Sequence, residues 1–168
     1  MSLTRHPVSS PICREMETEE QKKDRERLNR YIARENLVSI MNNTKWSELR
    51  DLMLSLENLS PKYRTMCLRI QSEDGYYWDS DWYYHLPTYK WIEWLDIDPI
   101  HRKHQGQLIN EKETDLTKRI KEMLWSKSIP FSIEESYIRI WGYQRPGNQI
   151  KFAYQDVAHN SGGCAPSA

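Results

Sequence analysis

The sequence predicts an α+β domain of two layers, in which a mostly antiparallel sheet of about five strands carries helices on one face. Three observations lead to this prediction. Some stretches have apolar residues at helical spacing, several shorter ones alternate apolar and polar residues, and turn sequences join the alternating stretches. Because strands joined by tight turns are antiparallel neighbours, the expected order is α-α-β-β-β-α-β-β.

The N-terminal part is predicted to be a tail followed by a charged helix. Residues 1–14 carry two prolines and no periodicity, so they are expected to be disordered. Residues 15–41 contain no Gly or Pro and many helix formers, with apolar residues only in their second half. The α+β domain is expected over 42–156, and a second disordered tail over 157–168.

The first half of the domain is predicted to hold one helix and three strands. Trp46, Leu49 and Met53 share one face of a helix that begins after capping residues at 42–44 and ends before Pro61. The strands follow from alternation and from the turn residues between them. They are expected over 65–72, over 75–86 in two extended pieces broken by Asp79-Ser80-Asp81, and over 91–98.

The second half begins with a predicted loop over 99–106, which holds His101 and His104. An apolar stripe then predicts a helix over 110–127. Alternation predicts further strands within 131–144 and over 149–156, and the sequence RPGN between them is typical of a turn.

The composition limits the class of protein. The chain has 168 residues, and its 24 Lys plus Arg balance its 24 Asp plus Glu, so the formal net charge is zero. This balance argues against nucleic acid or a membrane surface as the main partner. Seven Trp and ten Tyr against two Phe favour half-buried positions at surfaces, since Trp and Tyr carry a polar group.

The cysteines and the lack of targeting signals predict a cytoplasmic protein. Cys13, Cys67 and Cys164 are far apart and include no CxxC pair, which argues against a disulfide framework or a zinc site. The N-terminus has no apolar signal region, and no run approaches the ~20 apolar residues of a membrane span. No metal and no cofactor are expected.

One strand face is predicted to bind another protein. Ile138 and Ile140 point to one side of their strand, and an aromatic and arginine set points to the other. Tyr, Trp and Arg are enriched at the energetic centres of interfaces. Packing under the N-terminal helix, or against neighbouring strands, is the alternative. The predicted partner-binding residues are Trp82, Tyr83, His85, Arg139, Trp141 and Tyr143.

An acidic cluster provides an alternative site. Asp79, Asp81, Glu93 and Asp96, with His85, could serve an enzyme, possibly a metal-dependent one. The competing interpretation is that the two aspartates form turns with their own backbone, and that Glu93 makes a structural ion pair with Arg69 or Arg139.

No strong catalytic motif is present, so a non-enzymatic protein-interaction module is the leading hypothesis. The carboxylate and histidine enzyme is its first alternative. The second is a binder of single-stranded nucleic acid, which would stack bases on the aromatic rings and needs a basic groove.

Five motifs, in this order along the chain, resemble a small bacterial family of unknown function: NNTKWSELRDLM, PKYRT, YWDSDWYYHL, KWIEWLDI and IRIWGYQRPG. The resemblance spans residues 42–155 and implies a compact α+β domain of bacterial origin. It implies no catalytic residues. Small families of this kind include immunity proteins that bind and block a toxin, which makes an immunity-like or regulatory role the expected form of the interaction.

Overall fold

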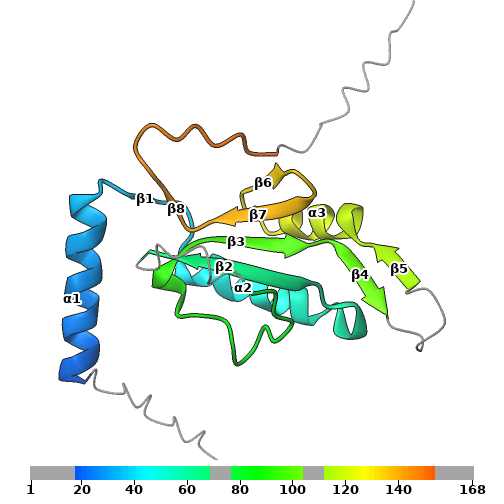
Figure 1. Cartoon of the computed structure of the whole chain (residues 1–168), viewed down its shortest axis with the longest axis horizontal. Helices are drawn as coiled ribbons and strands as arrows, with labels where there is room; N and C mark the ends of the chain where they lie inside the picture. Colours follow the sequence, from blue (N-terminus) through cyan, green and yellow to red (C-terminus); the bar gives the residue numbers. More distant parts are fainter. Residues whose placement is uncertain (1–17, 69–76, 104–111, 154–168) are drawn as a thin grey trace, which may run out of the picture.

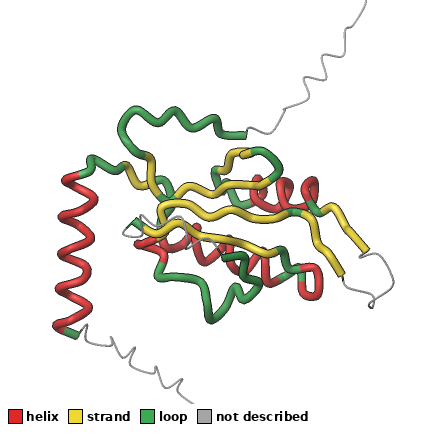
Figure 2. Tube along the Cα trace, in the orientation of Figure 1, coloured by secondary structure: helices red, strands yellow, loops and turns green. Residues whose placement is uncertain are grey.

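The computed structural model describes residues 18–68, 77–103 and 112–153, and its architecture is α+β as predicted. Four strands form the central antiparallel sheet, in the order β2-β3-β7-β6, and two small two-stranded sheets flank it. Figure 1 shows α2 and α3 on the same side of the central sheet, and Figure 2 shows its strands passing in front of both helices. The predicted tails at 1–14 and 157–168 lie outside the described residues.

Helix α1 (Glu19–Arg34) is shorter than the predicted helix over 15–41. Its first turn has a capping box, in which Thr18 and Gln21 exchange side-chain and backbone hydrogen bonds. The helix ends because Asn36 adopts φ of 51°, a left-handed conformation that asparagine tolerates at helix ends. Strand β1 (Val38–Ser39) follows and pairs with β8 (Tyr143–Gln144).

Helix α2 (Asn43–Leu54) begins where the capping residues predicted it, since the Asn42 side chain accepts a hydrogen bond from Lys45 N–H. The Lys45 ammonium donates to the Ser128 carbonyl at 2.6 Å, which ties the start of α2 to the segment after α3. A short 3-10 helix, η1 (Glu57–Leu59), leads to β2 (Lys62–Cys67).

The prediction of two extended pieces over 75–86 is wrong for residues 77–86, which are the part of this stretch that the structure describes. Only Asp79 pairs with a strand, through backbone hydrogen bonds in both directions with Tyr63, and residues 82–86 form turns. The side chains of Asp79 and Asp81 accept backbone N–H groups there and bend the chain. The predicted turn at Asp74-Gly75 lies outside the described residues.

Strand β3 (Ile92–Asp98) follows a short 3-10 helix, η3 (Tyr89–Trp91), and has β2 and β7 as its neighbours. The predicted loop over 99–106 instead contains β4 (Ile100–Lys103), which pairs with β5 (Lys112–Asp115). Strand β5 occupies the start of the predicted helix over 110–127.

Helix α3 (Thr117–Ser126) begins only after Asp115, whose carboxylate accepts the Thr117 N–H at 2.8 Å. Strands β6 (Phe131–Glu134) and β7 (Tyr137–Trp141) form a hairpin inside the region 131–144, where no turn was predicted. The predicted strand over 149–156 is wrong for residues 149–153, which make a single backbone hydrogen bond to Phe131.

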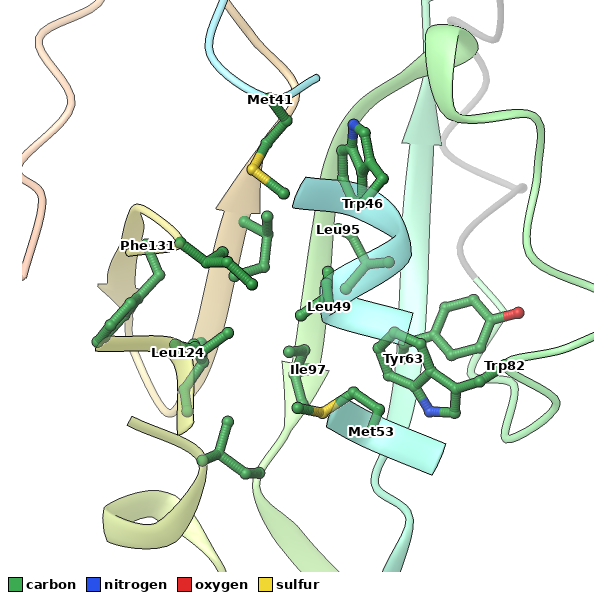
Figure 3. Close-up of a cluster of buried hydrophobic side chains, with 14 of the residues drawn as sticks. Met41, Trp46, Leu49, Met53, Tyr63, Trp82, Leu95, Ile97, Leu124 and Phe131 are labelled. Atoms are coloured by element: carbon green, nitrogen blue, oxygen red, sulfur yellow. The ribbon is translucent and has the colours of Figure 1, made fainter. Parts of the chain in front are cut away.

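The main core lies between the central sheet and helices α2 and α3. Figure 3 shows Leu49 and Met53 of α2 directed toward Leu95 and Ile97 of β3, with Leu124 of α3 beside them. Burying a large apolar side chain contributes about 1.5–3 kcal/mol, so this layer is the main source of stability. A second buried cluster holds α1 to the end of the sheet; its members are Leu28, Leu37, Leu68 and Tyr143.

Candidate functional site

The sheet face away from α2 and α3 carries a set of aromatic and charged side chains. Alternation along β3 sends Leu95 and Ile97 into the core and Trp94 and Asp96 to this other face. The cross-strand register places Asp96 directly between Arg64 on β2 and Arg139 on β7. We call the set the Arg–Trp face; it consists of Arg64, Trp78, Trp94, Asp96, Tyr137, Arg139 and Trp141.

Asp96 is the centre of this face and has 0% of its surface exposed. Its carboxylate accepts hydrogen bonds from Nε and Nη2 of Arg139 at 2.6 and 2.8 Å. Arg64 donates from Nε at 3.1 Å, and its Nη2 lies 3.0 Å from the same carboxylate. A buried carboxylate is tolerated only with such partners, because burying an unpaired charge costs several kcal/mol.

The Arg64 guanidinium lies over the rings of Trp78 and Tyr137, at 4.9 and 4.8 Å from their centres. These two rings also contact each other, with centres 5.1 Å apart. A cation over an aromatic face is attracted by about 0.5–2 kcal/mol, with the larger value at sites shielded from water. The stacking therefore fixes both the arginine and the rings.

Arg139 is held in the same way. Its guanidinium lies 4.0 Å from the centre of the Trp94 ring and 5.3 Å from that of Trp141. The indole N–H of Trp141 donates to the Ser132 hydroxyl at 2.8 Å, and this hydroxyl donates to Glu134 at 2.7 Å. The face is thus a connected network of aromatic contacts and hydrogen bonds.

The six predicted partner-binding residues do not share one face. Arg139 and Trp141 belong to the Arg–Trp face, although Trp141 is largely buried. The prediction that Trp82 belongs to a binding surface is wrong, because this residue is 1% exposed and its indole N–H donates to the Pro61 carbonyl at 2.8 Å. The prediction that Tyr143 shares a face with Arg139 is also wrong. The strand is interrupted at Gly142, and the Tyr143 ring therefore packs in the buried cluster beside α1.

Tyr83 and His85 lie in the turn after Trp82, on a different part of the surface. The Tyr83 side chain is 63% exposed and meets Tyr84 edge to face, with ring centres 4.7 Å apart. Asp81 accepts both of their backbone N–H groups, at 2.9 and 2.8 Å. The turn is therefore fixed, but its rings do not join the Arg–Trp face.

Two of the four acidic residues of the alternative cluster serve this turn. The Asp79 carboxylate accepts the N–H groups of Ser80 and Asp81 and lies 2.9 Å from His85 Nδ1. These backbone hydrogen bonds, led by that of Asp81, lower the pKa of Asp79. The competing turn interpretation of the sequence thus describes the two aspartates.

The other two acidic residues are paired with arginines. Glu93 accepts Nε and Nη2 of Arg145 at 2.6 and 2.7 Å, and Asp96 accepts Arg139. The expected partner of Glu93 was Arg69, outside the described residues, or Arg139, which is engaged elsewhere. The hydrogen bonds that Arg145 donates to Glu93 are the main reason that its pKa is raised, and an interaction with Tyr31 of α1 adds to the effect.

A metal centre has no ligand set within the part of the chain that the structure describes. No three His, Cys, Asp or Glu side chains gather there in a way that could hold an ion. His101 lies in β4, and His104 is outside the described residues. Over the described ranges, no helix combines the length and apolar character that crossing a bilayer requires.

We expect the Asp79 turn to make stability depend on pH. The pKa of Asp79 is lowered in the folded state from about 3.9 in the unfolded chain, so its contribution is complete above about pH 5. That contribution is lost as the pH falls through the lower, folded-state pKa. Asp79→Asn should therefore melt a few degrees below the wild type at pH 7, and the difference should shrink toward pH 2. A difference that stayed constant over this range in thermal melts would contradict the assignment.

Apart from Asp96, which belonged to the alternative acidic cluster, four residues of the Arg–Trp face were not among the predicted site residues. Arg64, Trp78 and Trp94 come from three separate segments, and only the strand register brings them together. Tyr137 shares its strand face with Arg139 and was recognisable from alternation. Arg64 follows Tyr63 in the strand, so the two side chains point to opposite faces of the sheet. This places Arg64 on the Arg–Trp face only once Tyr63 is known to be buried in the core.

The comparisons with known proteins identify a family and no relative of known function. No curated protein and no solved structure matches the chain. The model of one family matches residues 28–147, which include the second half of α1 and every residue of the Arg–Trp face. The predicted membership of a family of unknown function is confirmed. The chain belongs to a family of unknown function (DUF6678).

Proposed function

We propose that this protein is a non-enzymatic interaction module that binds another protein through the Arg–Trp face. One observation carries the proposal. Two arginines, each packed over two aromatic rings, lie on the sheet face that neither α2 nor α3 covers. Trp, Tyr and Arg are the side chains that contribute most energy at the centres of protein interfaces.

The rigidity of the face supports this role. Binding normally costs about 0.5–1.5 kcal/mol for each mobile side chain that becomes fixed. Asp96 already fixes both guanidinium groups, and Ser132 fixes the Trp141 ring. A partner would therefore meet a surface that loses little further conformational freedom.

The charge of the face supports a partner that brings apolar and acidic groups. Arg64 and Arg139 carry two positive charges against the one negative charge of Asp96, which is fully buried. The accessible part of the ion pair is thus positive, and the rings around it are apolar. A carboxylate set among apolar side chains complements both properties.

The alternatives have less support. An enzyme of this kind needs its carboxylates and histidine together in one site. Asp79 does contact His85, but both lie with Asp81 in the turn, while Glu93 and Asp96 pair with arginines elsewhere. Single-stranded nucleic acid needs a basic groove, and the carboxylate of Asp96 offsets one of the two arginine charges.

An immunity-like or regulatory role, a bacterial origin and a cytoplasmic location belong to the same proposal. The first two are supported by the family resemblance, because other small bacterial families of this kind include immunity proteins. Cys67, a free thiol whose pKa is raised by burial, is consistent with a reducing compartment.

Site-specific photo-crosslinking tests the proposed face. Benzoyl-phenylalanine in place of Tyr137 should give one discrete crosslinked protein in a lysate of the source organism. The control carries the same group at Lys118 on α3, whose side chain is 92% exposed. The captured protein, once purified, should form the crosslink again with Tyr137 as the labelled position. Equal products from both positions, or none from the face, would overturn the proposal.

A further inference from the structure

A pocket of about 350 Å³ opens beside the Arg–Trp face. Trp78 and Tyr137, the rings that hold Arg64, also form part of its wall. The pocket and the face therefore form one continuous surface. Side chains that fill well-packed pockets are the usual anchors of protein interfaces.

Two of the charged side chains that line the pocket, Asp98 and Arg102, are paired with each other. Asp98 accepts the Ile100 N–H at 3.0 Å and lies 2.7 Å from Nη1 of Arg102, so both of its carboxylate oxygens have partners. Arg102 also donates to Glu113 at 3.1 Å. Asp98 and Arg102, the two of these side chains that line the pocket, form one neutral ion pair, whereas Glu113 is not part of the pocket wall.

Lys62 is the exception among the charged groups of the pocket. It lines the pocket, is exposed, and lies opposite Asp98 in the strand register. Even so, its ammonium forms no ion pair with any residue in the described ranges. The pocket thus combines two aromatic walls with one cation that no described acid neutralises.

We propose that this pocket receives the side-chain carboxylate of a glutamate or aspartate from the partner, with Lys62 as its counter-ion. This inference rests on the proposed function and names the chemistry that the partner brings. Trp78 and Tyr137 contact the methylene groups of the inserted side chain. The face continues past Arg64 toward Trp141, so a partner chain that lies across it passes the pocket and continues. The group that enters the pocket is therefore a side chain of that partner and not its terminus.

Small peptides test the pocket without an identified partner. The probe is acetyl-Leu-Glu-Leu-amide, and its neutral match is acetyl-Leu-Gln-Leu-amide. Binding is followed by NMR through the indole N–H signal of Trp78, assigned with Trp78→Phe. We expect the glutamate peptide to shift this signal at millimolar concentration and the glutamine peptide to shift it much less.

A lysine variant tests the counter-ion. Lys62→Gln should weaken binding of the glutamate peptide about fivefold, the upper range for one exposed ion pair, and should leave the fold intact because Lys62 is exposed. Lys118→Gln on α3 is the matched control and should change nothing. A third peptide, acetyl-Leu-Gln-Leu with a free carboxyl terminus, should bind no better than its amide.

Three results would overturn the inference: equal binding of the glutamate and glutamine peptides, an unchanged affinity in Lys62→Gln, or preference for the free terminus. The photo-crosslink from position 137 separates this failure from failure of the face. If the crosslink persists while the peptides fail, the Arg–Trp face stands and the pocket does not serve it. If both fail, the interaction module itself is wrong.

Discussion

Replacing Asp96 with alanine is expected to lower the free energy of unfolding by about 3 kcal/mol, because breaking a buried ion pair leaves the remaining charges without a partner. The carboxylate is fully buried and accepts hydrogen bonds from both Arg64 and Arg139. Without it, two partly buried guanidinium groups of like charge would face each other. Urea unfolding followed by circular dichroism measures this loss.

The matched control is Asp51→Ala. Asp51 also pairs with an arginine, Arg50, but its side chain is 64% exposed. Exposed ion pairs contribute about 0–1 kcal/mol, so this variant should stay close to the wild type. A cost for Asp96→Ala as small as that of Asp51→Ala would show that the network is not a determinant of stability.

Gly142→Ala is expected to cost about 3 kcal/mol, at the upper end for forcing extra atoms into a packed interior. A Cβ atom at this position would overlap the carbonyl oxygen of Ile92, and it would lie 3.2 Å from Cζ2 of Trp46. The backbone of Ile92 belongs to β3 and cannot move without disturbing the central sheet. The same unfolding measurement applies, with the midpoint expected to fall.

Gly147→Ala separates crowding from conformational strain. Gly147 has φ of 79° in the turn after β8, and nothing lies within 4 Å of a Cβ atom there. Only the left-handed conformation penalises alanine, by about 1 kcal/mol. If Gly147→Ala were the more destabilising of the two, the close contact between β3 and the Gly142 backbone would not be the limiting constraint.

The sequence predicts well those helices and strands that bury only one side, because their apolar spacing reflects packing against a single layer. The helix with Trp46, Leu49 and Met53 on one face and the strand with Ile138 and Ile140 on one face follow from burial of a single side. Strand β5 was missed because its residues are polar and its pairing with β4 is a local backbone interaction. Residues 112–115 carry no apolar alternation that would distinguish them from a helix start.

The aromatic run shows why composition misleads. The aromatic residues at 77–86 suggest strands, but Asp79 and Asp81 bind backbone N–H groups and turn the chain. As a result, Trp82 enters the core while Tyr84 stays 81% exposed. Side-chain to backbone hydrogen bonds of this kind compete with strand pairing, and the residue types alone do not show which prevails.

The candidate site was only partly predictable for a related reason. Arg139 and Trp141 could be placed on one strand face from alternation. Their partners Asp96 and Trp94 required the register between β3 and β7, which no local pattern sets. Tyr143 follows the same alternation in sequence but lies beyond the irregular position Gly142, which reverses the direction of its side chain.

The closed base of the β4–β5 hairpin has a consequence for how the sheet forms. The Leu116 N–H donates to the Pro99 carbonyl at 2.9 Å, so the chain enters and leaves the hairpin at one point. Strands β3 and β7 pair although this hairpin, α3 and β6 lie between them in sequence. Bringing distant strands together costs entropy that grows with the length of free chain. A hairpin that closes early shortens that length, and so it can influence the folding rate even though the side chains described in its strands, at 100–102 and 112–115, are not buried.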